Sequence, residues 1–316
     1  MIGFLKSFFK SESEQPEEAE VKNKERNFDI LKYDGLKALK IGKTGYAIRC
    51  FNEALALKED SETLNYLAGT YVQLHEPENA IEIYSRLSAL EPENMDALLN
   101  RANLLLTTEQ PEQAIGSCNQ AIAVDTNDYR TYLIIAKAKQ ALKQAEEAIE
   151  AVSQAINLKE DLPQAYLLRA QLYFDTQQHE KALTDVNQTI SLSEEEENAF
   201  LLRGRIYEAL GQTEEALQNY NTVVELNPFN EQAYLEIGRL LMESHKLDEA
   251  IRHFDEAIEF KPDFGRAYSE RGRIKELTGD KEGAQADLQQ GAELQSENET
   301  ESQTVNFNKM YENRPL

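Results

Sequence analysis

The stretch that decides the fold runs from Glu197 to Asn230 and reads ENAFLLRGRIYEALGQTEEALQNYNTVVELNPFN. Apolar or small residues return every three or four positions in each half, which is the spacing of one face of an α-helix. Gly211-Gln212 interrupts the first stripe, and Asn227-Pro228 ends the second, because proline cannot continue a helix. The stretch therefore predicts two short amphipathic helices joined by a tight turn.

The same pattern returns along the chain at a nearly constant interval. An alanine early in each second stripe marks the register, at Ala47, Ala80, Ala114, Ala148, Ala182, Ala216, Ala250 and Ala284. The spacing is 33 residues once and 34 residues six times. Helices of this length are marginal alone in water, so neighbouring hairpins are expected to stack and stabilise one another. The interval predicts an array of about eight helical hairpins.

Two further positions of each unit have the chemistry of close helix packing. Small residues stand twelve positions before the marker alanine, at Gly35, Ala68, Ala102, Ala136, Ala170, Gly204, Gly238 and Gly272. Aromatic, aliphatic or thiol side chains stand four positions after it, at Phe51, Tyr84, Cys118, Val152, Val186, Tyr220, Phe254 and Leu288. On these residues the unit resembles the tetratricopeptide repeat (TPR), a helix–turn–helix of 34 residues. The resemblance implies an all-α fold, a right-handed α-solenoid (superhelix) of about eight TPR helix–turn–helix hairpins.

Composition divides the chain into four parts. Residues 1–10 form a short apolar or amphipathic segment, and residues 11–27 are rich in Glu and predict an acidic flexible linker. Residues 28–297 hold the eight predicted repeats, at about 28–60, 61–94, 95–128, 129–162, 163–196, 197–230, 231–264 and 265–297. Residues 298–316 form a polar C-terminal tail that matches poorly to a final helix.

The charge of the chain restricts its partners. Against 33 Lys and Arg there are 57 Asp and Glu, a net charge of −24 over 316 residues. This excess argues against nucleic acid, which is bound through basic side chains, and against broad adsorption to anionic lipid. Only Cys50 and Cys118 are present, and no apolar run is long enough to span a bilayer. We therefore expect a cytoplasmic protein.

No set of residues has the spacing of a catalytic or metal site. The four histidines, His75, His179, His245 and His253, lack the i, i+4 spacing of a helical metal pair and are expected to be solvated. Glycine-rich phosphate loops are also missing from the sequence. We therefore expect neither an enzyme nor a bound metal or cofactor.

In the TPR family the first helices of successive repeats line a groove that binds a partner. The resemblance places an apolar stripe there, formed by Leu99, Leu133, Ile134, Leu167, Leu168, Leu201, Leu202 and Leu235. It is interpreted as a trough for an amphipathic helix or an extended peptide. The alternative is that these residues pack against the neighbouring first helix.

Polar and basic residues flank this stripe. The first half offers amides and phenols that suit an extended peptide backbone, at Tyr33, Asn65, Tyr66, Asn100 and Asn103. Further along, the groove positions carry Lys137, Gln171, Arg205, Arg239 and Arg273. The four cations among them could select acidic ligands. Glu208, Glu236 and Glu270 lie three residues from Arg205, Arg239 and Arg273, so local ion pairs are the alternative.

The N-terminal segment is a second candidate for binding. Its apolar residues are Ile2, Phe4, Leu5, Phe8 and Phe9, and Lys6 and Lys10 flank them. It could cap the first hairpin, dock on a partner, or make weak contact with a membrane surface. The function predicted overall is a non-catalytic protein–protein interaction scaffold or adaptor that binds a peptide or helix in its groove. The alternative is a peripheral membrane-associated assembly or secretion accessory factor tethered by residues 1–10. Neither a particular partner nor an oligomeric state follows from the residues.

Overall fold

A computed structural model describes the backbone of residues 15–312 and the side chains of residues 20–296. Its residues form sixteen helices, α2 to α17, and no strand is present among them. The fold is an all-α solenoid, which confirms the predicted class. The chain divides into two compact units, Met1–Glu160 and Asp161–Leu316, which are described separately.

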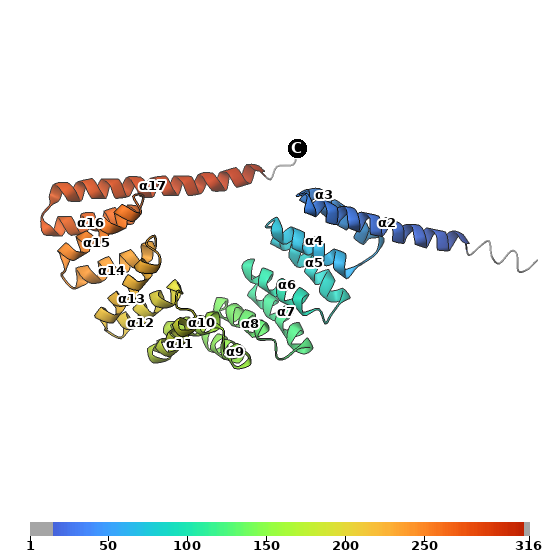
Figure 1. Cartoon of the computed structure of the whole chain (residues 1–316), viewed down its shortest axis with the longest axis horizontal. Helices are drawn as coiled ribbons and strands as arrows, with labels where there is room; N and C mark the ends of the chain where they lie inside the picture. Colours follow the sequence, from blue (N-terminus) through green and yellow to red (C-terminus); the bar gives the residue numbers. More distant parts are fainter. Residues whose placement is uncertain (1–14, 313–316) are drawn as a thin grey trace, which may run out of the picture. The chain divides into compact units, whose positions relative to one another are not determined.

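The first unit contains four helical hairpins. Each hairpin pairs two consecutive helices that lie side by side (Figure 1). The helices are α2 (Gln15–Lys40), α3 (Thr44–Leu57), α4 (Ser61–Gln73), α5 (Pro77–Leu90), α6 (Met95–Thr107), α7 (Pro111–Val124), α8 (Tyr129–Ala141) and α9 (Ala145–Leu158). Within this unit α3 also contacts α4, α5 contacts α6, and α7 contacts α8.

The second unit repeats this arrangement. Its helices are α10 (Pro163–Asp175), α11 (His179–Leu192), α12 (Glu197–Ala209), α13 (Thr213–Leu226), α14 (Glu231–Glu243), α15 (Leu247–Phe260), α16 (Gly265–Thr278) and α17 (Lys281–Glu312). In addition α10 contacts α12 and α14 contacts α16, so first helices also meet one another.

Local sequence explains where the helices begin. Pro77, Pro111 and Pro163 are the first residues of α5, α7 and α10, where the missing N–H of proline is harmless. Asn94 and Asn230 precede α6 and α14, and their side chains accept hydrogen bonds from the backbone N–H three residues on.

The small residue of each unit sits where its two helices approach most closely. A Cβ on Gly204 of α12 would lie 2.5 Å from Cε1 of Tyr220 on α13. Tyr220 is fully buried, so the missing side chain of Gly204 makes room for this ring. Cys118 occupies the same position as Tyr220 in its own hairpin and is also fully buried. Its burial raises the pKa of the thiol to about 12, so the thiol stays protonated at neutral pH.

Two predictions about the ends of the array need correction. The flexible linker predicted at residues 11–27 is helical from Gln15, because α2 runs without a break to Lys40. The polar tail predicted at residues 298–316 is helical as far as Glu312, within α17. A formed helix is extended at little cost, so both polar segments continue helices that the packed hairpins nucleate. Residues 1–10 lie outside the described part of the chain.

None of the helices in the described part combines the length and the apolar character that crossing a membrane requires.

Candidate functional site

The first helices of the second unit share one face, which we call the first-helix face. It is formed by residues of α10, α12, α14 and α16 that line two hollows. The hollow over α10 and α12 has a volume of about 390 Å³. Its lining residues are Gln164, Leu167, Leu168, Gln171, Asn198, Leu201, Leu202, Arg205 and Gln232. Most of the residues predicted for this part of the groove therefore meet around a single depression.

The predicted apolar stripe divides into two sets. Leu99, Ile134, Leu201 and Leu202 are buried, with 3–8% of their surface exposed, and belong to the hydrophobic core. These four residues pack inside the array, as the alternative predicted. The prediction that they form a trough for a partner was therefore wrong. Leu133, Leu167, Leu168 and Leu235 are half-buried. Only these four leucines keep surface that a partner could cover.

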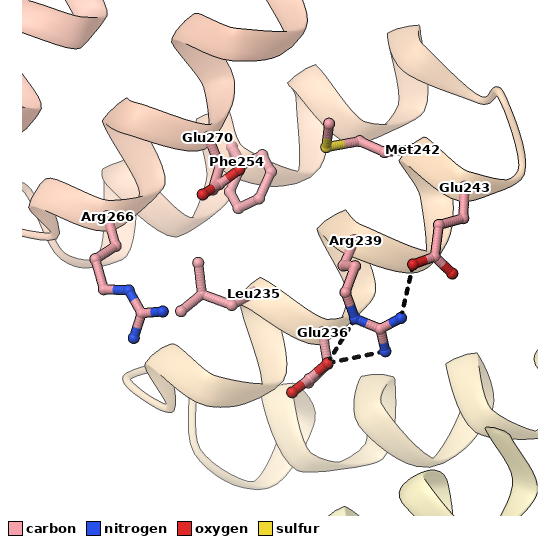
Figure 2. Close-up of a pocket in the computed structure, with 8 residues that line it drawn as sticks. All are labelled: Leu235, Glu236, Arg239, Met242, Glu243, Phe254, Arg266 and Glu270. Carbon is pink, nitrogen blue, oxygen red and sulfur yellow. Dashed lines mark hydrogen bonds and ion pairs between the residues drawn. The ribbon is translucent and has the colours of Figure 1, made fainter. Parts of the chain in front are cut away.

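The second hollow lies over α14 and α16 and has a volume of about 420 Å³. Leu235, Met242 and Phe254 supply its apolar lining, and Figure 2 shows charged side chains around them. The charged lining consists of Glu236, Arg239, Glu243, Arg266 and Glu270. Apolar surface is thus available here inside a charged rim.

Arg239, one of the cations predicted to select acidic ligands, is neutralised by carboxylates. Its guanidinium pairs with Glu236 at 3.0 Å and with Glu243 at 2.9 Å on the same helix (Figure 2). A third partner, Glu208, comes from α12 of the preceding hairpin. Glu208 also accepts a hydrogen bond of 2.5 Å from Tyr220. Burial and this bond raise the pKa of the Tyr220 hydroxyl, which therefore stays protonated.

Of the three arginines predicted to select acidic ligands, Arg205 alone lacks a carboxylate partner among the described residues. Arg273 pairs with Glu270 at 2.7 Å, as the alternative predicted. The alternative predicted a pair between Arg205 and Glu208, but the Glu208 carboxylate instead binds Arg239 and Tyr220. Its guanidinium lies over the ring of Phe174 at 4.8 Å instead. A cation held beside the first hollow is therefore available to an external acceptor.

The predicted polar residues of the first unit divide in the same way. Tyr66 donates to Glu62 at 2.8 Å, and Asn100 donates weakly to Tyr84 at 3.4 Å. Asn100 is nevertheless exposed, as are the remaining four predicted residues, Tyr33, Asn65, Asn103 and Lys137. They remain candidates for binding.

Sequence reasoning missed some lining residues of the first hollow. Gln164, Asn198 and Gln232 stand at the second position of three successive repeats, exactly one interval of 34 residues apart. That interval was the signal that could have found them.

From the sequence we expect His253 to be solvated, but this side chain is largely buried. Its Nε2 donates to the Tyr234 carbonyl at 3.2 Å, and burial lowers its pKa to about 4.

Among the residues whose side chains are described, no three His, Cys, Asp or Glu gather in a way that could hold a metal ion.

Comparison with known proteins identifies the repeat. Models of the tetratricopeptide repeat match residues 71–138, 129–162, 163–196 and 235–298, and a further TPR repeat model matches residues 204–244. A search of curated proteins gives no match.

Three solved structures illustrate the likeness. MamA is 24% identical and covers 51% of this chain and 95% of its own, with a TM-score of 0.49. A tetratricopeptide repeat protein from Parabacteroides merdae is 19% identical, covers 74% of this chain and 93% of its own, and has a TM-score of 0.57. Pseudomonas aeruginosa pilF is 19% identical, covers 68% and 97%, and has a TM-score of 0.53. The last two show the fold alone.

The hairpins and the first-helix face define the class of protein, a helical repeat scaffold for protein–protein interaction. The chain belongs to the tetratricopeptide repeat family.

Proposed function

We propose that the first-helix face of the second unit binds an extended segment of a partner protein, without catalysis. The hollow over α10 and α12 carries the proposal, because it combines three kinds of contact in one place. Leu167 and Leu168 offer apolar surface for an anchoring side chain. The amides of Gln164, Asn198 and Gln232 can both donate to and accept from a peptide backbone.

The charge at this site indicates the chemistry of the ligand. Arg205 has no carboxylate partner within the described part of the chain and is held in place by the Phe174 ring. A carboxylate of the ligand beside its apolar anchor would pair with this guanidinium. The second hollow would receive a further apolar side chain against Leu235 and Met242.

A displayed library of random peptides, selected on the full chain, tests the proposal. We expect the selected peptides to share an apolar residue next to an acidic one. Leu168→Glu and Arg205→Glu should each weaken their binding at least tenfold. Leu192→Glu and Arg252→Glu are the matched controls, because both residues are exposed on second helices, α11 and α15.

Circular dichroism and urea titration of each variant separate loss of binding from loss of fold. Equal binding by Leu168→Glu and Leu192→Glu would show that the hollow is not the site. If Leu168→Glu unfolds the second unit, the Arg205→Glu variant provides the test. The charge at Arg205 can be reversed without disturbing the core, because this side chain lies beside the hollow.

A further inference from the structure

The first hairpin exposes a face that later hairpins bury. In the second unit, Ala199 and Ile206 of α12 share a core cluster with Ala182 and Val186 of the preceding helix α11. They are the third and tenth residues of their repeat, and both are fully buried. A first helix therefore normally turns these positions towards the hairpin before it.

The equivalent residues of the first hairpin have no preceding hairpin among the described residues. Its third position is Ile30, which is 47% exposed, and its tenth is Lys37, which is exposed. Ile41 and Tyr46 lie close by and are 61% and 47% exposed. Three large apolar side chains thus remain uncovered at the place where the solenoid would accept a neighbour.

Lys37, Ile41 and Tyr46 line a hollow of about 440 Å³. We call the residues that line this hollow, together with Ile30, the leading face. Its lining is Asp34, Lys37, Ala38, Ile41, Lys43, Tyr46 and Arg49. Three cations therefore accompany one carboxylate. The guanidinium of Arg49 lies 5.6 Å from the centre of the Tyr46 ring. Residues 35–52 contain four basic residues and no acidic one, in a chain whose net charge is −24.

We propose that the leading face docks on an anionic lipid bilayer. Exposed isoleucines would enter the acyl boundary, a tyrosine would lie at the headgroup level, and the cations would pair with lipid phosphates. A nucleic acid would use the cations but would leave Ile30 and Ile41 exposed to water. Apolar and basic groups on one face therefore favour the bilayer.

The sequence of residues 1–10 agrees with this occupant. Lys6 and Lys10 accompany five large apolar residues there. These lysines have the same sign as Lys37, Lys43 and Arg49, so charge disfavours residues 1–10 as the cover of the leading face. The same composition suits the bilayer, and two weak membrane contacts together anchor a protein far better than one.

The acidity of the whole chain does not oppose docking through one end. Charges more than about 8 Å apart are largely screened at physiological ionic strength. At about 1.5 Å per helical residue, Glu20 lies roughly 25 Å along α2 from Lys37. Asp34 and Glu53 lie close enough to act electrostatically on Tyr46, so the three cations of the leading face have at least two carboxylates beside them.

Flotation of the full chain with vesicles tests the proposal. We expect binding to vesicles that contain phosphatidylglycerol and little binding to pure phosphatidylcholine. Lys37→Glu combined with Lys43→Glu should weaken partitioning at least tenfold, and Ile41→Ser should also weaken it. Lys137→Glu with Lys143→Glu is the control, because it makes the same charge change at exposed lysines of another hairpin in the same unit. Equal loss in both double variants, or no preference for anionic lipid, overturns the proposal.

Measurements without vesicles distinguish the other occupants. If deletion of residues 1–10 speeds amide exchange in α2 and α3, that segment covers the leading face itself. If Ile41→Ser converts a dimer to a monomer by light scattering, a second copy covers it. Either result, or binding of generic RNA in place of vesicles, overturns the proposal that the leading face docks on a bilayer. Circular dichroism confirms that each variant is folded.

Discussion

The backbone of Gly35 lies against the ring of Phe51, so closely that a Cβ on Gly35 would be 2.5 Å from Cε1 of that ring. Phe51 stands sixteen residues later, is fully buried, and belongs to the core cluster of the first two hairpins. The same spacing joins Gly204 to Tyr220 and Gly238 to Phe254. Where the small residue is Ala136 or Ala170, its partner is a valine. At the three glycine crossings, the missing side chain makes room for the aromatic ring.

Gly35→Ala is expected to lower the free energy of unfolding by about 1–3 kcal/mol, because overpacking outweighs the gain in helix propensity. Phe51→Val alone should also destabilise, by leaving a cavity. The double variant should lose less than the sum of the two, with a coupling of about 1 kcal/mol or more. Urea denaturation measures all three. Simple additivity would show that the two residues do not compete for space.

His253 gives the second unit a dependence on pH. Burial lowers its pKa from 6.5 to about 4, although the Tyr234 carbonyl accepts from the ring. The unfolded chain therefore binds a proton below pH 6.5 that the folded chain rejects. The neutral His253 side chain makes its full contribution to the free energy of unfolding above pH 6.5. As the pH falls towards 4, the free energy of unfolding decreases by about 3 kcal/mol.

His253→Ile should remove this part of the acid sensitivity, because Ile83 occupies the same position in another hairpin and is buried. Urea midpoints at pH 7.5 and pH 4.5 provide the measurement, with the wild-type chain as reference. The prediction is refuted if the variant and the wild-type chain lose equal stability on acidification.

Arg101 lacks the carboxylate that two arginines at the same repeat position have. Arg169 pairs with Asp185 at 2.6 and 2.9 Å, and Arg271 pairs with Asp287 at 2.8 and 2.7 Å. Both partners stand sixteen residues after the arginine. The corresponding residue for Arg101 is Ser117, and the buried Nε of Arg101 has no hydrogen-bond partner.

Ser117→Asp should therefore raise the free energy of unfolding by about 1–2 kcal/mol, since a charge-assisted bond replaces an unsatisfied donor. In the Arg101→Leu background the same change should destabilise, because the new carboxylate would be buried alone. Thermal and urea unfolding of the four chains give the comparison. A loss of stability in both backgrounds would contradict the prediction.

The hairpin turns hold one residue in the left-handed region. Gly42, Gly211 and Gly279 take this conformation freely, whereas Gln177 has φ of 60° and Glu109 has φ of 57°. Gln177→Gly should raise stability by about 0.5–1 kcal/mol, because an L side chain is strained there. Gly211→Gln is the reciprocal variant and should lose a similar amount. Opposite signs by urea denaturation are required, and equal signs would refute the role of the turn.

Much of the fold was predictable because its signals are local and repeated. The interval between marker alanines located the hairpins, and the small residues located the close crossings. The polar ends at residues 15–26 and 298–312 were not predicted as helices, since they lack an apolar stripe. They are helical as extensions of packed helices, which nucleate them.

The candidate site was predictable only in outline. Helical spacing places Leu168 and Leu202 on first helices, but it does not tell that Leu202 is 3% exposed while Leu168 keeps free surface. The angle at which neighbouring hairpins meet decides this. The sequence likewise suggested Glu208 as the partner of Arg205, and packing gave that carboxylate to Arg239, 31 residues away.

By itself, the sequence determined the family, the repeat interval and the residue sizes at each crossing, because these depend on neighbours within one hairpin. Only the tertiary structure decided which leucines are core, that Arg205 has no carboxylate partner among the described residues, and that the first hairpin leaves Ile30 and Ile41 uncovered. Those properties arise between hairpins, where side chains more than thirty residues apart compete for the same surface or charge.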